Sequence, residues 1–353
     1  MIWAMTDPQW NQLLRVLAGH ALPTVPVGLI VDSPFVPPWA GVPMLDYLSD
    51  DACWLEANLR LCQRFPEIWF LPGFWAEFGM CTEPSAFGSK CVFPASEFPF
   101  AEKMLADHRQ IDALKKPNCR TDGLLPFVIR RLQRTRDRIE AAGHRIRFAI
   151  CRGPLNVASY LLGHTEFLEG IKTEPAATHR LLALVSDFLV EWLTYQVQCF
   201  DTIDGVLVLD DLVGFLGPAD FREFALPYLR RVLAAVEVSV KAFHNDAYGL
   251  ICARELRSLG VNLFNFSFEH SLGQIRQLAG DGVTLLGNIP PRDVLARGTP
   301  ADVRQSAKAA LATLSDRRWV ILSAGGGTPP GVPSENLDAL VVAATEWQGT
   351  GDG

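Results

Sequence analysis

The 353-residue sequence predicts an α/β fold, a single (β/α)8 TIM barrel. Three observations support this prediction: eight short apolar runs rich in β-branched residues, helical patterns between them, and a length that suits one barrel with insertions. The runs are Val25–Val31, Ile68–Leu71, Arg147–Ile150, Gly205–Leu209, Val238–Phe243, Val261–Phe266, Val283–Leu286 and Trp319–Leu322. Strands that alternate with helices pair in parallel through right-handed crossovers, so eight of them predict a closed barrel.

Amphipathic periodicity predicts the helices between these strands. The clearest are residues 7–17, Ala52–Cys62, Pro175–Cys199, Pro218–Val236 and Pro300–Leu314. Several open on a proline, whose missing N–H is harmless in the first helical turn. The basic stretch 130–138 alternates with Gln, Asp and Glu, which predicts the solvated face of a further helix.

The stretch 72–126 is the longest insertion and is rich in Phe, Pro and Gly. We expect it to fold over the C-terminal mouth of the barrel, within one domain of residues 1–353. The alternative is an open doubly wound sheet with a second domain. Its dinucleotide-binding form needs a glycine-rich turn after the first strand, where this sequence has Asp32-Ser33-Pro34 instead.

The composition indicates the general class of protein to which the chain belongs. A net charge of -7 with 49% hydrophobic residues is typical of a soluble globular protein and gives no electrostatic reason to expect nucleic-acid binding. No stretch approaches the ~18 apolar residues of a membrane span, and the first residues lack a signal-peptide pattern. We therefore expect a cytoplasmic monomer or homodimer. Its eight cysteines form no CxxC pair and are expected to be reduced thiols.

Polar side chains stand at the ends of most predicted strands, where a barrel carries its active site. The candidate catalytic residues are Asp210, Asp211, His244, Asp246 and Glu269, and the candidate substrate-binding residues are Trp75, Glu77, Arg152 and Asn288. His244 and Asp246 are two positions apart at a strand end. Because alternate residues of a strand face the same side, both are predicted to face the mouth.

Several of these residues allow more than one interpretation. Adjacent carboxylates such as Asp210 and Asp211 repel each other, so one needs a cation, a proton or a hydrogen-bond donor, unless the pair caps a helix. Arg152 suits an anionic group of a substrate, or a salt bridge to a nearby carboxylate. Trp75 belongs to an aromatic-rich stretch that either lines an apolar pocket or packs beneath the insertion. Glu269 and His270 diverge, so at most one faces the centre.

Four segments resemble the uroporphyrinogen decarboxylase superfamily, in the order in which the family carries them. They are Gly153-Pro154 with Gly163, the Asp210-Asp211 pair followed by GPADFREFALPY (217–228), GNI (287–289) and PPGVPSENL (329–337). The match spans most of the chain. It implies a (β/α)8 barrel, in agreement with the strand count.

The superfamily contains porphyrinogen decarboxylases and also methyltransferases that work with a corrinoid protein and zinc. The sequence lacks the arginine-rich RQAGRY segment of the decarboxylases and is more similar to the methyltransferases. Their thiol-methylating members carry His-x-Cys after the fifth strand and a second Cys after the eighth. Here His244 is present, and Asp246 and Gly326 stand where the cysteines would be.

The resemblance implies removal of a methyl group from a small-molecule ether or amine and its transfer to a corrinoid protein, with zinc as a candidate cofactor. A site without thiolates is harder and suits activation of a leaving group better than activation of a thiol. His244, Asp246 and Glu269, with Asp210 or Asp211, are the candidate metal ligands or proton donors. The alternatives are a metal-free decarboxylase or lyase that binds an anionic small molecule at Arg152, and a non-catalytic barrel that binds a tetrapyrrole or corrinoid.

Overall fold

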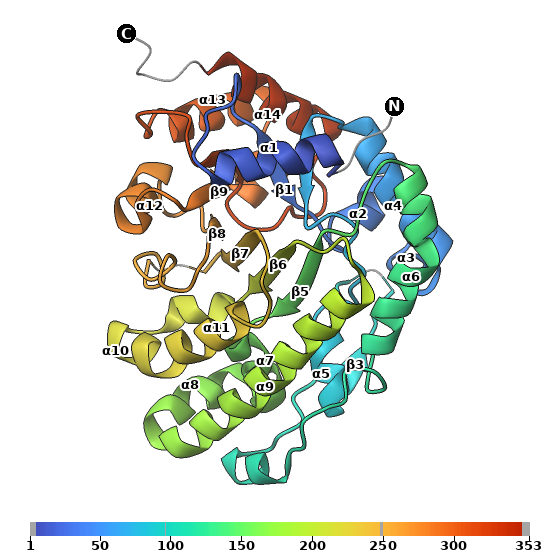
Figure 1. The fold of residues 1–353 in the computed structure, drawn as a ribbon, viewed down its shortest axis with the longest axis vertical. Coiled ribbons are helices and arrows are strands. Elements are labelled where there is room, and N and C mark those ends of the chain that lie inside the picture. Colours follow the sequence, from blue (N-terminus) through green and yellow to red (C-terminus); the bar gives the residue numbers. More distant parts are fainter. Residues whose placement is uncertain (1–4, 96, 248–249, 348–353) are drawn as a thin grey trace.

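Eight parallel strands with helices around them form the molecule (Figure 1). The computed structural model describes residues 5–95, 97–247 and 250–347. The strands are β1 (Val27–Ile30), β2 (Ile68–Leu71), β5 (Phe148–Arg152), β6 (Gly205–Leu209), β7 (Val240–Asn245), β8 (Leu263–Phe266), β9 (Thr284–Ile289) and β10 (Val320–Ala324). Their order in the sheet is β2-β1-β10-β9-β8-β7-β6-β5. This curled parallel sheet confirms the predicted (β/α)8 class, including the pairing of β6 with β7.

Four strands continue two or three residues past their predicted ends. The apolar run before His244 ends at Phe243, for example, but β7 reaches Asn245. The backbone ladder continues because polar residues also pair: Leu209 lies opposite His244, and Asn288 lies opposite Ser323. Several candidate residues that were expected just beyond the strands are therefore held inside the sheet, which fixes their direction.

All five expected helices form to within a few residues, and one of them contains a π-helical stretch. The helices on the predicted segments are α1 (Asp7–Leu17), α4 (Asp51–Arg64), α9 (Pro175–Cys199) and α13 (Pro300–Leu311). The segment expected as one helix from Pro218 to Val236 is helical without a gap from Pro218 to Leu233, as α10 (Pro218–Asp220), the π-helical η3 (Phe221–Ala225) and α11 (Leu226–Leu233). Pro227 has no N–H to donate, so the regular α-helical hydrogen-bond pattern is not kept just before it, and the π-helical stretch lies there.

The remaining described elements are helices and a separate two-stranded antiparallel sheet. They are α2 (Val36–Ala40), α3 (Met44–Ser49), α5 (Thr82–Phe87), β3 (Cys91–Val92), β4 (Phe100–Ala101), η1 (His108–Ala113), α6 (Leu125–Ala141), α7 (Pro154–Leu162), α8 (His164–Thr173), η2 (Asp211–Phe215), α12 (Leu272–Ala279), η4 (Pro291–Ala296) and α14 (Ser334–Glu346). No helix within the described ranges is both long and apolar enough to cross a membrane.

The barrel has two apolar cores. A large one lies between the sheet and the helices, and a smaller one fills the barrel interior. Helix α1 packs against the interior core, where the ring of Trp10 meets that of Phe148 edge-on with centroids 5.6 Å apart. Thr6 and Gln9 form a capping box that fixes the start of this helix. Because α1 closes the end of the barrel at which the strands begin, the open end is the one at which they finish.

Candidate functional site

The inward positions at the carboxyl ends of the strands change from apolar to polar. Phe148, Ala242, Leu286 and Ile321 belong to the interior core, and side chains two or four positions further along a strand face the same side. The residues at those positions are Arg152 on β5, His244 on β7, Asn288 on β9 and Ser323 on β10. The strand register therefore gathers polar groups at the mouth.

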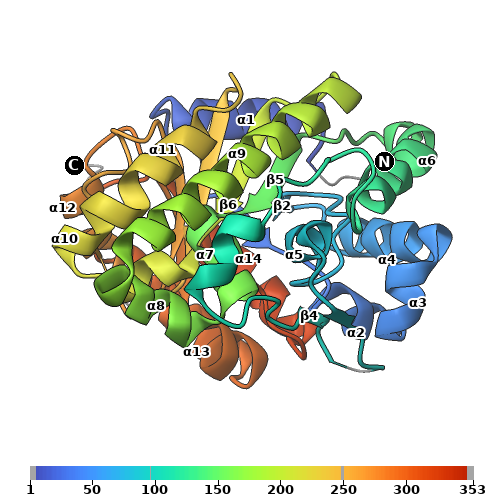
Figure 2. The ribbon, with the colours of Figure 1, turned by 90° about the horizontal axis from the view of Figure 1, so that it is seen from below.

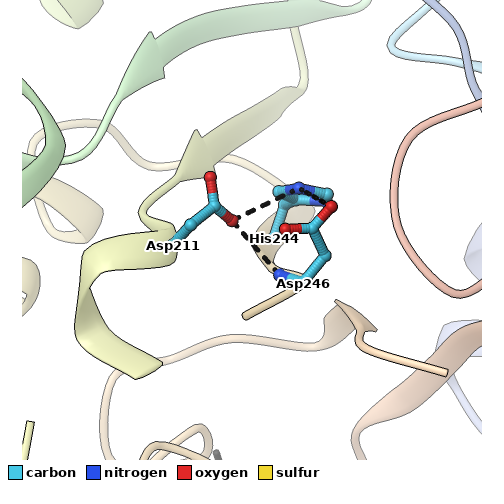
Figure 3. A group of neighbouring side chains, drawn as sticks. All are labelled: Asp211, His244 and Asp246. Atoms are coloured by element: carbon cyan, nitrogen blue, oxygen red, sulfur yellow. Dashed lines mark hydrogen bonds and ion pairs between the residues drawn. The ribbon is translucent and has the colours of Figure 1, made fainter. Parts of the chain in front are cut away.

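Asp211, His244 and Asp246 form one group at this mouth (Figure 3). Nε2 of His244 lies 3.5 Å from Oδ1 of Asp211 and 3.7 Å from Oδ2 of Asp246. The backbone N–H of Asp246 donates to Oδ1 of Asp211 over 3.2 Å. The three ligand atoms all lie within 4.8 Å of one another. The group thus joins the start of η2 to the end of β7.

Asn265 on β8 fixes the orientation of the His244 ring. Nδ2 of Asn265 donates to the carbonyl oxygens of Leu286 (2.7 Å) and Ala324 (3.1 Å). The amide oxygen must therefore face Nδ1 of His244, 2.7 Å away, and this ring nitrogen must carry the proton that is donated. In the neutral ring, Nε2 then points its lone pair at the two carboxylates.

Three side-chain acceptors consequently converge, namely Nε2 of His244 and the carboxylates of Asp211 and Asp246. Removal from water raises the pKa of Asp246; the positive charge of a protonated His244 opposes this shift, and the negative charge of Asp211 adds to it. A convergent set of one imidazole and two carboxylates is stabilised by a cation or by a shared proton.

The geometry of the group fits a divalent metal. Two ligands on a tetrahedral zinc are about 3.4 Å apart when each bond is roughly 2.05 Å long. The observed separations of 3.5 and 3.7 Å from His244 are close to that value. Gly326 borders the group, because a Cβ at this position would lie 2.8 Å from Oδ2 of Asp246. The group therefore offers one nitrogen and two oxygens, and Gly326 contributes no side chain.

Asp210 has a different environment from its neighbour Asp211. It is fully buried, and its carboxylate accepts the N–H groups of Leu155 (2.9 Å) and Asn156 (3.0 Å) in the first turn of α7. A Cβ on Gly153 would come within 2.3 Å of this carboxylate, so glycine permits the close approach. Burial raises the pKa of Asp210, and the two N–H donors oppose that shift. Asp210 thus accepts N–H groups at the start of α7 as a helix cap does, and its catalytic role stays a prediction.

Replacing Asp210 with alanine is expected to destabilise the fold by about 1–2 kcal/mol, because two N–H groups of α7 lose their acceptor. Asp210→Asn should lose less, since one amide oxygen still accepts. Urea denaturation followed by circular dichroism measures both values. Equal stability of the alanine variant and the native protein would contradict the capping role.

Asn156 also positions Asp211. Its amide Nδ2 lies 3.4 Å from Oδ2 of Asp211, and its Oδ1 accepts the N–H of Leu212 over 3.1 Å. Tyr160, one turn further along α7, lies close enough to Arg152 and Asp211 for their charges to act on its pKa, which burial raises. Helix α7 therefore carries the side chains that flank the group on one side.

Arg152 is held by two carboxylates of the insertion. Nη2 lies 2.9 Å from Oε2 of Glu77, and Nη1 lies 3.4 Å from Oε2 of Glu83, with all three side chains buried. Glu77 also accepts the hydroxyl of Ser33 over 2.9 Å. Burial by itself would lower the pKa of Arg152, but the two charges outweigh it and raise the pKa. Of the two interpretations of Arg152, the structure shows the salt bridge, which also places this part of the insertion at the end of β5.

The other candidates lie outside the group. Glu269 is exposed in the loop after β8, and its carboxylate is not part of the group. The second carboxylate beside His244 and Asp246 is that of Asp211. Trp75 is buried in the interior core, with the guanidinium carbon of Arg152 5.9 Å from its ring centroid. Asn288 is buried and donates to the carbonyl oxygen of His270, which ties β9 to the loop after β8.

Sequence reasoning missed Asn265, Asn156 and Tyr160. Asn265 had a usable signal, because it is the polar residue in the strand LFNF and shares the inward register of Leu263. No such signal marks Asn156 and Tyr160 in the sequence, because a helical residue four or more positions from the strand end can face either the mouth or the solvent.

Comparison with known proteins places the chain in a family. A family model described as Uroporphyrinogen decarboxylase (URO-D) matches residues 9–347. The uroporphyrinogen decarboxylase of Photobacterium profundum is 26% identical over 305 residues, 82% of each chain. That of Thioalkalivibrio sulfidiphilus is 24% identical over 356 residues, 96% of this chain and 97% of the relative.

Two solved structures share the fold. A methyltransferase from Methanosarcina mazei aligns with a TM-score of 0.81 and 19% identity over 95% of this chain and 98% of its own. A B12-independent methionine synthase from Shewanella sp. aligns with a TM-score of 0.52 and 12% identity over 92% and 97%. These structures share the overall fold of this chain, and the family model that matches residues 9–347 shows that the chain belongs to the uroporphyrinogen decarboxylase family.

Proposed function

We propose that the protein is a methyltransferase that removes a methyl group from a small-molecule ether or amine and passes it to a corrinoid protein. The observation that carries this proposal is the group of Asp211, His244 and Asp246 at the ends of β6 and β7. The likeness in fold to a structure described as a methyltransferase supports it.

The chemistry requires an acid at the donor. When the methyl group leaves an oxygen or nitrogen, the electron pair of the broken bond stays on that atom, which then needs a proton or a Lewis acid. A divalent metal such as zinc, when bound by the group, would supply the Lewis acid. Asn265 holds the His244 ring so that Nε2 faces this position, and Asp211 and Asp246 supply the balancing negative charge.

Without a metal, the same residues can hold a proton. Asp246 is the candidate donor, because desolvation and the charge of Asp211 both raise its pKa. The two carboxylates also make the mouth unfavourable for an anionic substrate, which supports a neutral or cationic methyl donor.

Decarboxylation is the second candidate, favoured by the names of the curated relatives. It requires a group that binds the substrate's carboxylates, and Arg152 was the expected one. Because Glu77 and Glu83 already neutralise Arg152, the geometry gives methyl transfer the stronger support.

Metal content and methyl transfer can be tested together. Protein purified without chelator is expected to contain about one divalent metal per chain by elemental analysis, the content of a mononuclear site. With a panel of methyl ethers and methylamines, it should convert reduced cobalamin, a surrogate for the corrinoid protein, to methylcobalamin, followed by absorbance. Removing the metal should stop the reaction, and adding zinc should restore it.

Three results would contradict this proposal in different ways. If the metal-free protein keeps full activity, the leaving group is activated by general-acid catalysis and not by a Lewis acid. Release of carbon dioxide from a carboxylated substrate, without methylcobalamin, would support decarboxylation. Tight binding of cobalamin or a tetrapyrrole with no turnover of any substrate would support the non-catalytic barrel.

A further inference from the structure

A groove of about 1020 Å³ lies on the outer side of the barrel, between α3, the start of α4 and α6. Figure 2 shows these three helices side by side. Arg131 joins them, because its side chain donates to Oδ1 of Asp51 (3.1 Å) and to the carbonyl oxygen of Leu48. Arg131 itself is buried, which corrects the expectation that the whole basic stretch 130–138 faces solvent.

One end of the groove is apolar and open to water. Phe127 at the start of α6 is 60% exposed, and Leu45 on α3 is 40% exposed. Phe93 of the insertion and Leu124 lie beside them. Exposed apolar side chains that cluster around a concave surface are typical of sites that bind a partner.

The rest of the groove is lined by four arginines and by two aspartates, Asp50 and Asp51, at the start of α4. Arg130, Arg134 and Arg138 are spaced at i, i+4 and i+8 on α6, so they share one face of that helix over about 12 Å. Arg134 is 3.3 Å from Asp51, but within the described residues neither Arg130 nor Arg138 forms an ion pair. This face of α6 is therefore cationic, and the arginines lining the groove outnumber its aspartates, on a chain whose net charge is -7.

We propose that this groove binds an acidic amphipathic helix of a partner protein. The apolar face of such a helix would cover Phe127 and Leu45, and its carboxylates would meet the three exposed guanidinium groups. A row of cations at helical spacing matches carboxylates that recur along a second helix, whereas a small amphiphile brings a single anionic head. Arginine together with exposed aromatic side chains is also the composition of protein interfaces. This proposal does not depend on the proposed methyl transfer.

A designed peptide tests the groove directly. The probe is a fluorescein-labelled helical peptide of about 18 residues, with leucines at helical spacing on one face and glutamates on the other. Its fluorescence anisotropy should rise on titration with the full-length protein, and binding should weaken in high salt. The double variant Arg130→Glu/Arg138→Glu should bind at least about tenfold more weakly. Phe127→Ser should also weaken binding.

The controls separate this surface from general charge effects. Arg304→Glu alters an exposed arginine on α13 and should bind the peptide like the native protein. Circular dichroism and metal content should be unchanged in the groove variants. The proposal fails if a matched lysine peptide or a scrambled peptide binds equally well, or if the double variant keeps native affinity. It also fails if dodecyl phosphate binds the groove while the peptide does not, or if sedimentation shows a dimer of this chain that Phe127→Ser dissociates.

Discussion

Replacing His244 with alanine is expected to abolish stoichiometric metal binding and to lower the rate of methyl transfer by about 10²–10⁴-fold, the contribution of a positioned acid–base or ligand group. His244 is the only nitrogen donor of the described group, and the carboxylates of Asp211 and Asp246 converge on its Nε2. Titration calorimetry with zinc measures the binding, and the absorption spectrum of the cobalt-substituted protein reports the ligand set independently of activity.

A graded series makes this prediction specific. Asn265→Ala removes the group that orients the ring without removing a ligand, so metal affinity should fall by a smaller factor, about 10–100-fold. His20→Ala alters an exposed histidine far along the chain and should leave metal affinity unchanged. If His244→Ala binds zinc as tightly as the native protein does, the metal lies elsewhere. If metal binding is lost but activity remains, the group acts as a structural site.

Replacing Arg152 with methionine is expected to cost about 3–5 kcal/mol of stability, because it leaves the charges of Glu77 and Glu83 buried without a partner. Arg64→Met provides the matched control. Arg64 pairs with Asp338 on the surface, where both side chains are nearly half exposed, so its loss should cost at most about 1 kcal/mol. Chemical denaturation of the purified variants measures both values.

A second substitution distinguishes the two roles of Arg152. Adding Glu77→Gln to Arg152→Met removes one of the unpaired charges, so part of the lost stability should return. If Arg152→Met is as stable as Arg64→Met and instead raises the KM for substrate, then Arg152 binds an anionic substrate group and the decarboxylase reading regains support.

The positions of His244 and Asp246 show how much of the site a local sequence pattern can predict. Both were predicted to face the mouth from their spacing of two residues, and the structure brings both to the same group with Asp211. The eight strands and the longest helix were predictable for the same reason, because the apolar periodicity of a strand or helix lies within one continuous stretch of the sequence. Strand ends were less accurate, because a polar inward residue such as Arg152 ends the apolar run but not the backbone ladder.

By itself, the sequence determined the barrel, the end of it that carries polar side chains, and the residues from which a site is drawn. Only the tertiary structure decided which of them meet. Asp210 and Asp211 are adjacent in the chain, yet Asp210 caps α7 and Asp211 faces His244. The reason is that the carboxylate of Asp210 accepts N–H groups of residues more than fifty positions away in the sequence. In the same way, Arg152 pairs with Glu77 and Glu83, and Asn265 forms a hydrogen bond with His244. These partners are separated by 21 to 75 residues in the sequence. Such pairings depend on which strands and loops become neighbours, and that information lies in the packing of the whole chain rather than in any one segment of it.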